Sequence, residues 1–177
     1  MTTQGKEYGV ALYSLAVEEH CEDEVLNGLC LAADVFAENP GYITLVQNPA
    51  ISKEERLGLL DKAFEGNVHT YVRSLLKLLC ERFSLGALAG CLQEFKALLY
   101  EARNILPVSV ISAVPLTEEQ QSVLRDKLSA KTGKTVLLEP SVDPSVLGGI
   151  KLCYKGQELD GTTAGRLEAL RRNLIQA

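Results

Sequence analysis

The stretch that decides the fold runs Val142-Asp-Pro-Ser-Val-Leu-Gly-Gly-Ile-Lys-Leu152, and Asp160-Gly-Thr-Thr-Ala-Gly-Arg-Leu167 follows it closely. Asp143 before a proline indicates a turn, and Asp160-Gly161 before threonines indicates a second turn with a helix cap. The pair Gly148-Gly149 ahead of an apolar run indicates close backbone approach or a bulge before a buried strand. We interpret these five residues as structural, because neither stretch contains a catalytic motif or a phosphate-binding loop.

The chain around these stretches has strand patterns from Ile105 onward. Segments rich in β-branched residues predict strands over residues 106–115, 135–138, 149–154 and 157–159. A capping box of Thr117 and Gln120 predicts a helix from 117 to about 131, and Thr162 or Thr163 caps a predicted last helix that runs to about 176. Residues 105–177 are therefore expected to form a β-α-β-β-β-α domain, a small mixed sheet with two helices.

Residues 1–104 have helical periodicity instead. Short breakers such as Asn39-Pro40-Gly41 and Asn48-Pro49 separate six predicted helices. The predicted helices span residues 5–19, 22–38, 41–47, 52–65, 68–83 and 86–103. The fold expected for the whole chain is mainly α with an α/β C-terminal part, in which a six-helix N-terminal domain precedes the sheet domain.

The first predicted helix carries two apolar stripes on opposite sides. One stripe consists of Tyr8, Ala11, Leu12 and Leu15, and the other of Val10, Tyr13 and Val17. Because a helix on one side of a bundle needs only one apolar stripe, something else must cover the second. It is either the chain's own bundle or a partner helix held in a groove. The fifth helix, by contrast, has one stripe typical of ordinary core, formed by Val72, Leu75, Leu76, Leu79 and Phe83.

Composition and charge argue against several classes of protein. The net charge is −5, and residues 1–104 carry nine Lys/Arg and fifteen Asp/Glu. An acidic half argues against nucleic-acid binding and suits either a basic partner or a solvated surface. The five cysteines lack a CxxC pair and are interpreted as reduced core thiols, while His20 and His69 lie far apart. We predict no catalytic residue, no metal site and no cofactor.

The chain also lacks membrane and export signals. No apolar run approaches the roughly 20 residues that cross a bilayer, and the N-terminus has no basic segment followed by an apolar one. Direct membrane insertion is therefore not expected.

The order of these motifs resembles the delta subunit of F-type ATP synthases, the family called oligomycin-sensitivity-conferring protein in mitochondria. The resemblance is carried by residues 8–12, 45–56, 110–117, 142–150, 159–162 and 166–167. Two positions depart from the usual pattern. Gly9 replaces the usual alanine, which weakens an isolated helix by up to about 1 kcal/mol, and Thr162 replaces the usual serine.

The resemblance implies a non-catalytic stator subunit. In this family the N-terminal domain holds the N-terminal helix of an alpha subunit in a groove between helices 1 and 5. The resemblance thus places Tyr8, Ala11, Leu12 and Leu15 near that partner. The C-terminal domain joins the C-terminus of the b-subunit stalk, for which we expect the basic residues Arg166, Arg171 and Arg172 of the last helix. The implied location is the cytoplasmic face of the cell membrane, as a peripheral part of the synthase.

Two other interpretations remain at this stage. One is an adaptor of similar architecture that joins two helical partners in another complex. The other is a small enzyme with an unrecognised site at the domain junction, which the lack of converging titratable groups argues against.

Overall fold

The structure is a computed structural model that describes residues 3–144, 146, 148–154 and 156–162. It divides the chain into two compact units, Met1–Leu99 and Tyr100–Ala177. The division falls a few residues before the predicted junction at Ile105, inside the last helix of the first unit. Each unit is described by itself.

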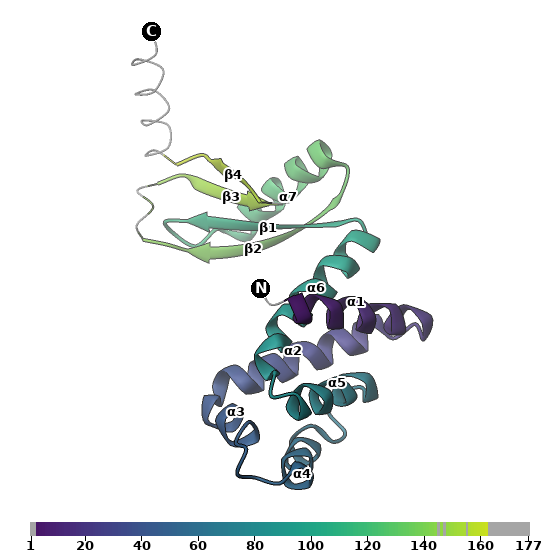
Figure 1. The fold of residues 1–177 in the computed structure, drawn as a ribbon. Helices are drawn as coiled ribbons and strands as arrows, with labels where there is room; N and C mark the ends of the chain where they lie inside the picture. Colours follow the sequence, from purple (N-terminus) through teal and green to yellow (C-terminus); the bar gives the residue numbers. More distant parts are fainter. Residues whose placement is uncertain (1–2, 145, 147, 155, 163–177) are drawn as a thin grey trace. The chain divides into compact units, whose positions relative to one another are not determined.

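The first unit is helical throughout, as predicted. Its elements are α1 (Thr3–Glu18), α2 (Glu22–Glu38), α3 (Pro40–Val46), α4 (Lys53–Phe64), α5 (Thr70–Glu81), a 3-10 turn (Leu85–Ala87) and α6 (Leu88–Ala102) (Figure 1). The predicted helix over 86–103 thus begins with a 3-10 turn. The mainly α fold with a mixed α/β C-terminal part is confirmed.

Side chains mark the starts of α4 and α5. At Ser52 the hydroxyl accepts from the backbone N–H of Glu55 at 3.3 Å, and the carboxylate of Glu55 accepts from the Ser52 N–H. These two bonds form a capping box. His69 precedes α5 as its N-cap, because its Nδ1 accepts from the Tyr71 N–H at 3.3 Å. The helix therefore starts two residues later than predicted, and His69 stands before the first turn rather than in it.

The core of the first unit collects side chains from every helix. Its largest fully buried members are Phe64, Phe95, Leu29, Leu60, Leu76 and Leu79. Phe83 is not among them, so its predicted place in the core is wrong. It follows α5 at a φ of +51°, remains 48% exposed, and lies 4.3 Å from the guanidinium of Arg56. Because α5 ends at Glu81, Phe83 no longer follows the helical spacing, and its ring lies off the apolar stripe.

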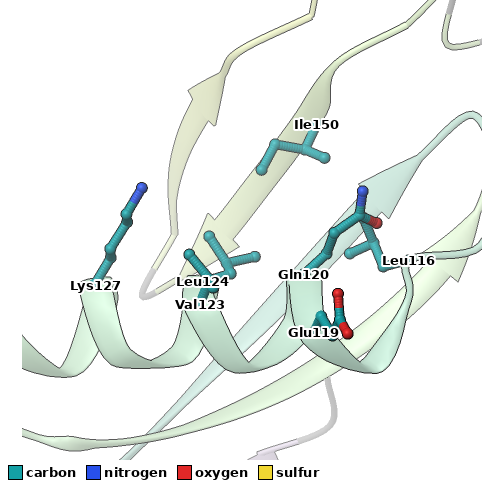
Figure 2. Close-up of a pocket in the computed structure, with 7 residues that line it drawn as sticks. All are labelled: Leu116, Glu119, Gln120, Val123, Leu124, Lys127 and Ile150. Atoms are coloured by element: carbon teal, nitrogen blue, oxygen red, sulfur yellow. The ribbon is translucent and has the colours of Figure 1, made fainter.

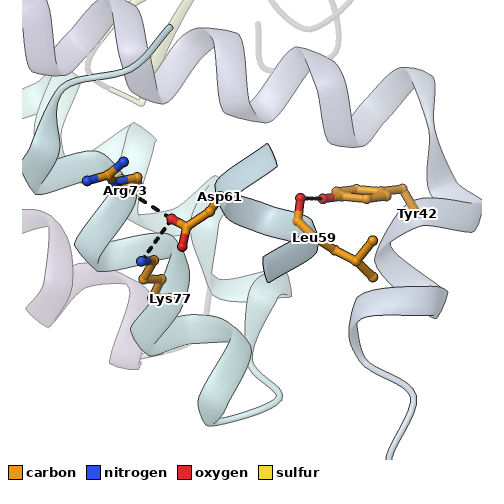
Figure 3. A network of polar contacts seen from close by, with 5 residues as sticks. All are labelled: Tyr42, Leu59, Asp61, Arg73 and Lys77. Carbon is orange, nitrogen blue, oxygen red and sulfur yellow. Dashed lines mark hydrogen bonds and ion pairs between the residues drawn. The ribbon is translucent and has the colours of Figure 1, made fainter. Parts of the chain in front are cut away.

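Polar contacts join α3, α4 and α5 at the edge of this core. The Tyr42 hydroxyl donates to the carbonyl of Leu59 at 2.9 Å, and Lys77 forms an ion pair with Asp61 at 2.8 Å. Figure 3 shows both contacts. Arg73 lies further from Asp61, at 3.8 Å. Since these charged side chains are about one-third exposed, each pair contributes at most about 1 kcal/mol. They align helices that the apolar core holds together.

Two glycines let α1 approach the backbone of the 3-10 turn and of α6 closely. A Cβ on Gly5 would lie 2.9 Å from the Ala87 carbonyl oxygen and 3.2 Å from the Gly90 Cα. A Cβ on Gly9 would lie 2.7 Å from the Glu94 Cβ. Real Cβ atoms do not approach so closely, so the two helices meet here only because α1 has glycine at both positions. The glycine expected to weaken the first helix is therefore required by its packing.

The second unit is a four-stranded mixed sheet with one described helix. It contains β1 (Ile105–Ser112), α7 (Glu118–Thr132), β2 (Thr135–Val142), β3 (Ile150–Tyr154) and β4 (Gln157–Asp160), in the order β2-β1-β3-β4. β1 and β2 are parallel, and the other two pairings are antiparallel. The predicted helix from Thr162 or Thr163 to about 176 lies outside the described residues.

The second strand is longer than the sequence predicts. β2 pairs with β1 over eight residues, from Thr135 to Val142, although its second half is exposed and includes Pro140. A proline is tolerated because β2 is an edge strand with no partner on its other side. An apolar pattern therefore predicts only the apolar half, Thr135–Leu138, in which Val136 is buried.

The two turns quoted at the outset meet in space. Gly148 and Gly149 have φ values of +126° and +87°, and a Cβ on Gly149 would lie 2.5 Å from the Gly161 carbonyl oxygen. The Gly161 N–H donates to Ile150 at 3.0 Å. The Asp160 carboxylate accepts from the Thr162 N–H at 2.9 Å, and hydrogen bonds from Thr162 lower the pKa of Asp160. Asp143 donates its N–H to the Ser112 carbonyl at 2.9 Å.

Replacing Gly9 tests the α1–α6 contact. We expect Gly9→Ala to destabilise the protein by about 1–3 kcal/mol, because the added methyl overpacks the crossing. Gly58→Ala is the matched control. It lies within α4 with no neighbour within 4 Å of its Cβ position, and removing a helical glycine gains up to about 1 kcal/mol. Urea unfolding of the full chain, followed by circular dichroism, measures both. Equal stability of the two variants would contradict the close approach.

Replacing Gly149 tests the meeting of the two turns. In Gly149→Ala the added methyl group costs about 1–2 kcal/mol of strain at a positive φ. It also clashes with the backbone of Gly161. Gly156 also has a positive φ, +74°, but nothing lies within 4 Å of its Cβ position. Gly156→Ala therefore has the conformational strain without the clash. We therefore expect amide hydrogen exchange at Leu152 to accelerate more in Gly149→Ala than in Gly156→Ala. The same acceleration in both variants would show that conformation, and not proximity to Gly161, requires Gly149.

Candidate partner-binding site

The titratable side chains of the described residues do not form a metal site. No group of three or more His, Cys, Asp or Glu side chains within this part of the chain is placed to hold a metal ion. Burial raises the pKa of the Cys91 thiol to about 12 and raises that of Cys80 as well. Both thiols are therefore protonated at neutral pH and poorly nucleophilic. His69 caps α5, and the carboxylate of Asp160 is held within its turn.

A groove between α1 and α5 is the surface feature that the sequence analysis singled out. It encloses about 210 Å³. Its lining consists of Tyr8, Ala11, Leu12 and Leu15 from α1 and of Tyr71, Ser74, Leu75 and Leu78 from α5. All four α1 residues predicted to lie near a partner are thus brought together on one surface, and α5 supplies the facing wall.

The groove has a buried floor and open walls. Leu12 and Leu75 are only 5% and 7% exposed and belong to the core of the first unit. Ala11 is exposed and Leu15 is 43% exposed. An apolar surface left open beside a packed floor is a feature of helix-binding grooves.

The two ends of the groove differ in charge. At one end the guanidinium of Arg82 donates to the Tyr8 hydroxyl at 3.0 Å. At the other end lies Tyr71, whose pKa is raised by desolvation and by the nearby negative charge of Glu19. Glu24 lies beyond it, 4.0 Å from the Nε2 atom of His69. An apolar segment in this groove therefore meets a cation at one end and carboxylates at the other.

The core-facing side of α1 differs from both predicted stripes. It is formed by Gly5, Gly9, Leu12 and Ala16, which are all buried. The stripe of Val10, Tyr13 and Val17 does not enter the core as a whole, because Val10 and Val17 remain 46% and 39% exposed. Only Tyr13 packs inward, with its ring centroid 5.6 Å from that of Phe95. Apart from Leu12, this face consists of glycine and alanine, which a search for large apolar side chains overlooks.

Three groove residues of α5 were missed by the sequence analysis, which treated this helix as ordinary core. They are Tyr71, Ser74 and Leu78. Tyr71, Leu75 and Leu78 follow each other at spacings of four and three, a second apolar stripe beside the one in the core. This spacing is the signal that predicts a two-sided helix.

The remaining candidates belong to the C-terminal half. Asp143, Gly148, Gly149, Asp160 and Gly161 lie in the turns around β3, as described above. Arg166, Arg171 and Arg172 lie outside the described residues. Among the helices that the structure describes, none has the length and apolar character to span a membrane.

Comparison with known proteins places these features in a family. The chain matches the family described as ATP synthase delta (OSCP) subunit over residues 5–174. A protein of Geobacillus sp. (strain WCH70) named ATP synthase subunit delta is 36% identical over 171 residues, which cover 96% of each chain. A protein of the same name from Halalkalibacterium halodurans is 33% identical and is matched over 92% of its length by 95% of this chain.

A solved structure shares the fold. One chain in the structure of the Toxoplasma gondii mitochondrial ATP synthase hexamer superposes with a TM-score of 0.78, and 98% of each chain is covered. The two sequences are 21% identical, so this likeness speaks for the fold alone.

Proposed function

The chain belongs to the ATP synthase delta (OSCP) subunit family, and we propose that it links the catalytic alpha/beta hexamer to the b-subunit stalk. The family is a structural, non-catalytic component of the ATP synthase. As part of a peripheral stalk, the protein would keep the hexamer from turning with the rotor, so that proton-driven rotation is coupled to ATP synthesis. Its proposed location is the cytoplasmic face of the cell membrane, without insertion into the bilayer.

The groove between α1 and α5 is the observation that supports this proposal. From Tyr8 to Leu15 it follows about 10 Å of α1, or two helical turns. An amphipathic helix with apolar side chains at i, i+3 or i+4 and i+7 fits a groove of that length. We assign this groove to the N-terminal helix of an alpha subunit.

The walls of the groove decide which substitutions are informative. Ala11 is exposed and leaves room for a partner's side chain, so a larger or charged residue there blocks docking without entering the core. Leu12 and Leu75 serve both the floor and the core, and truncating either would cost about 2–5 kcal/mol of stability. A loss of binding in those variants would not separate docking from folding.

We therefore expect Ala11→Glu to weaken binding of the alpha N-terminal helix. A charge in the apolar groove costs at least about 1.4 kcal/mol, or tenfold in affinity. Isothermal titration of the full chain with a synthetic alpha N-terminal peptide measures the effect. Val10→Glu is the matched control, because Val10 is exposed on α1 but does not line the groove. Unchanged affinity in Ala11→Glu, or an equal loss in Val10→Glu, would place the partner elsewhere.

The C-terminal domain is our proposed attachment for the stalk. Arg166, Arg171 and Arg172 give the last segment of the chain a basic character, suited to acidic residues of a b subunit. Charges at the rim of an interface act mainly through association rate and salt dependence.

Reversing two of these charges tests the stalk contact. For a chain carrying Arg171→Glu and Arg172→Glu we expect weaker b-subunit binding at low salt, with a difference from wild type that narrows as salt screens the charges. Binding of the alpha peptide to the same chain is the internal control and stays unchanged. Equal b-subunit binding by variant and wild type at every salt concentration would exclude these arginines from the contact.

A further inference from the structure

The groove of α1 and α5 continues into a polar pocket at one of its ends. This pocket encloses about 490 Å³. Tyr71 lines both the groove and the pocket, so the two form one continuous surface. Glu19, Glu24 and His69 also line the pocket. A helix that lies in the groove therefore has one of its ends next to these polar side chains.

The pocket end of the groove is acidic. Glu19 follows the last turn of α1, and the first turn of α2 consists of carboxylates at residues 22–24. The sequence has no lysine or arginine between Lys6 and Lys53. The part of α1 beyond Lys6 and the whole of α2 therefore supply no ammonium or guanidinium group to these carboxylates.

The basic side chains of α5 do not neutralise this end either. Arg73 and Lys77 form ion pairs with Asp61, at 3.8 Å and 2.8 Å. His69 lines the pocket, but its Nδ1 accepts a hydrogen bond from a backbone N–H. That bond requires an unprotonated Nδ1, so the ring that makes it is neutral. The carboxylates of the pocket are thus left to attract a cation from a partner.

The opposite end of the groove is basic. Tyr8 lines the groove there, and its hydroxyl accepts from the guanidinium of Arg82 at 3.0 Å. A tyrosine hydroxyl is uncharged at neutral pH, so this bond does not neutralise Arg82. Lys53 and Glu81 nearby in the chain form their own ion pair at 3.2 Å. Arg82 can therefore attract a negative group of a partner.

The backbone dipoles of α1 and α5 do not select a direction for a partner helix. Tyr8 lies beside Arg82, and Tyr71 shares the pocket with Glu19, so the two helices run antiparallel. A partner in the groove is then antiparallel to one helix and parallel to the other. Its interactions with the two macrodipoles oppose each other, and the charged side chains at the two ends decide the direction.

We propose that the partner helix lies antiparallel to α1, with a positively charged N-terminal end at Glu19 and Glu24 and its C-terminal end at Arg82. This inference rests on the proposed docking of an alpha N-terminal helix and adds its direction. The N-terminus of a helix presents unpaired N–H groups and the positive end of its macrodipole. An amino group or a basic side chain there adds a full charge. The unpaired carbonyls of the C-terminal end suit Arg82.

Paramagnetic broadening in NMR spectra of the full chain tests the direction. The alpha N-terminal peptide carries a nitroxide on a cysteine at its first or at its last position. We expect the first label to reduce the amide signals of Thr70 and Tyr71 more than that of Arg82, and the last label to do the reverse. The 12 residues of α5 span about 18 Å, which separates its two ends. A reversed pattern, or equal losses at both ends with each label, would overturn the inference.

A second apolar groove distinguishes failure of the direction from failure of the docking. It lies in the second unit, encloses about 470 Å³, and has Ile150 on β3 facing α7 across it (Figure 2). Val123 lines this groove and is 53% exposed, so its methyl signals report on binding there. Signal loss at Val123 with none along α1 and α5 would overturn the proposed function and the direction with it. The reversed pattern overturns the direction alone.

Neutralising the acidic end tests the charge contact. We expect a chain carrying Glu19→Gln and Glu24→Gln to bind the peptide about threefold more weakly at low salt, with a difference from wild type that narrows as salt rises. The matched control carries Asp34→Asn and Glu38→Gln, which remove two exposed carboxylates of α2 outside the groove and the pocket. Its affinity stays that of wild type. Equal losses in the two double variants, or none in the first, would overturn the inference.

Discussion

The first unit depends on the contact of α1 with the backbone of α6 at Gly5 and Gly9. With no side chain at these two positions, the helices come closer than any larger residue allows. Leu12 and Ala16 continue the same side of α1 into the core. Since Gly5, Gly9, Leu12 and Ala16 face the core, Tyr8, Ala11 and Leu15 are left beside α5. The groove follows from this choice of packing.

The described elements follow from local sequence signals, whereas the details of packing do not. Capping residues and breakers fix where the helices start, and the strand patterns predict a mixed sheet. The errors have physical causes. Hydrophobic periodicity detects only large apolar side chains, so it did not detect the side of α1 that carries Gly5 and Gly9. It also placed Phe83 in the apolar stripe of the fifth helix, although α5 ends before this residue. It ended the second strand at Leu138, where the apolar pattern ends, although pairing with β1 continues to Val142.

The candidate site was partly predictable for the same reason. Periodicity predicted two apolar stripes on α1, and the resemblance to the family chose the one formed by the groove residues. The resemblance placed the other wall on helix 5, but its residues were not named, because the core stripe of that helix satisfied the pattern and hid the second stripe. In our proposal this surface is the functional feature of a non-catalytic subunit. Each apolar side chain buried by a partner gains about 1.5–3 kcal/mol, so two or three anchors supply about 3–9 kcal/mol toward the cost of association and ordering.

We propose that the groove of α1 and α5 receives a partner helix while the opposite side of α1 does not. Methyl NMR spectra of the full chain, recorded with and without the alpha N-terminal peptide, distinguish the two sides. We expect shift changes at Ala11, Leu15 and Leu78, which line the groove, and none at Val10 and Val17. Changes centred on Val10 and Val17, or confined to the second unit, would contradict it.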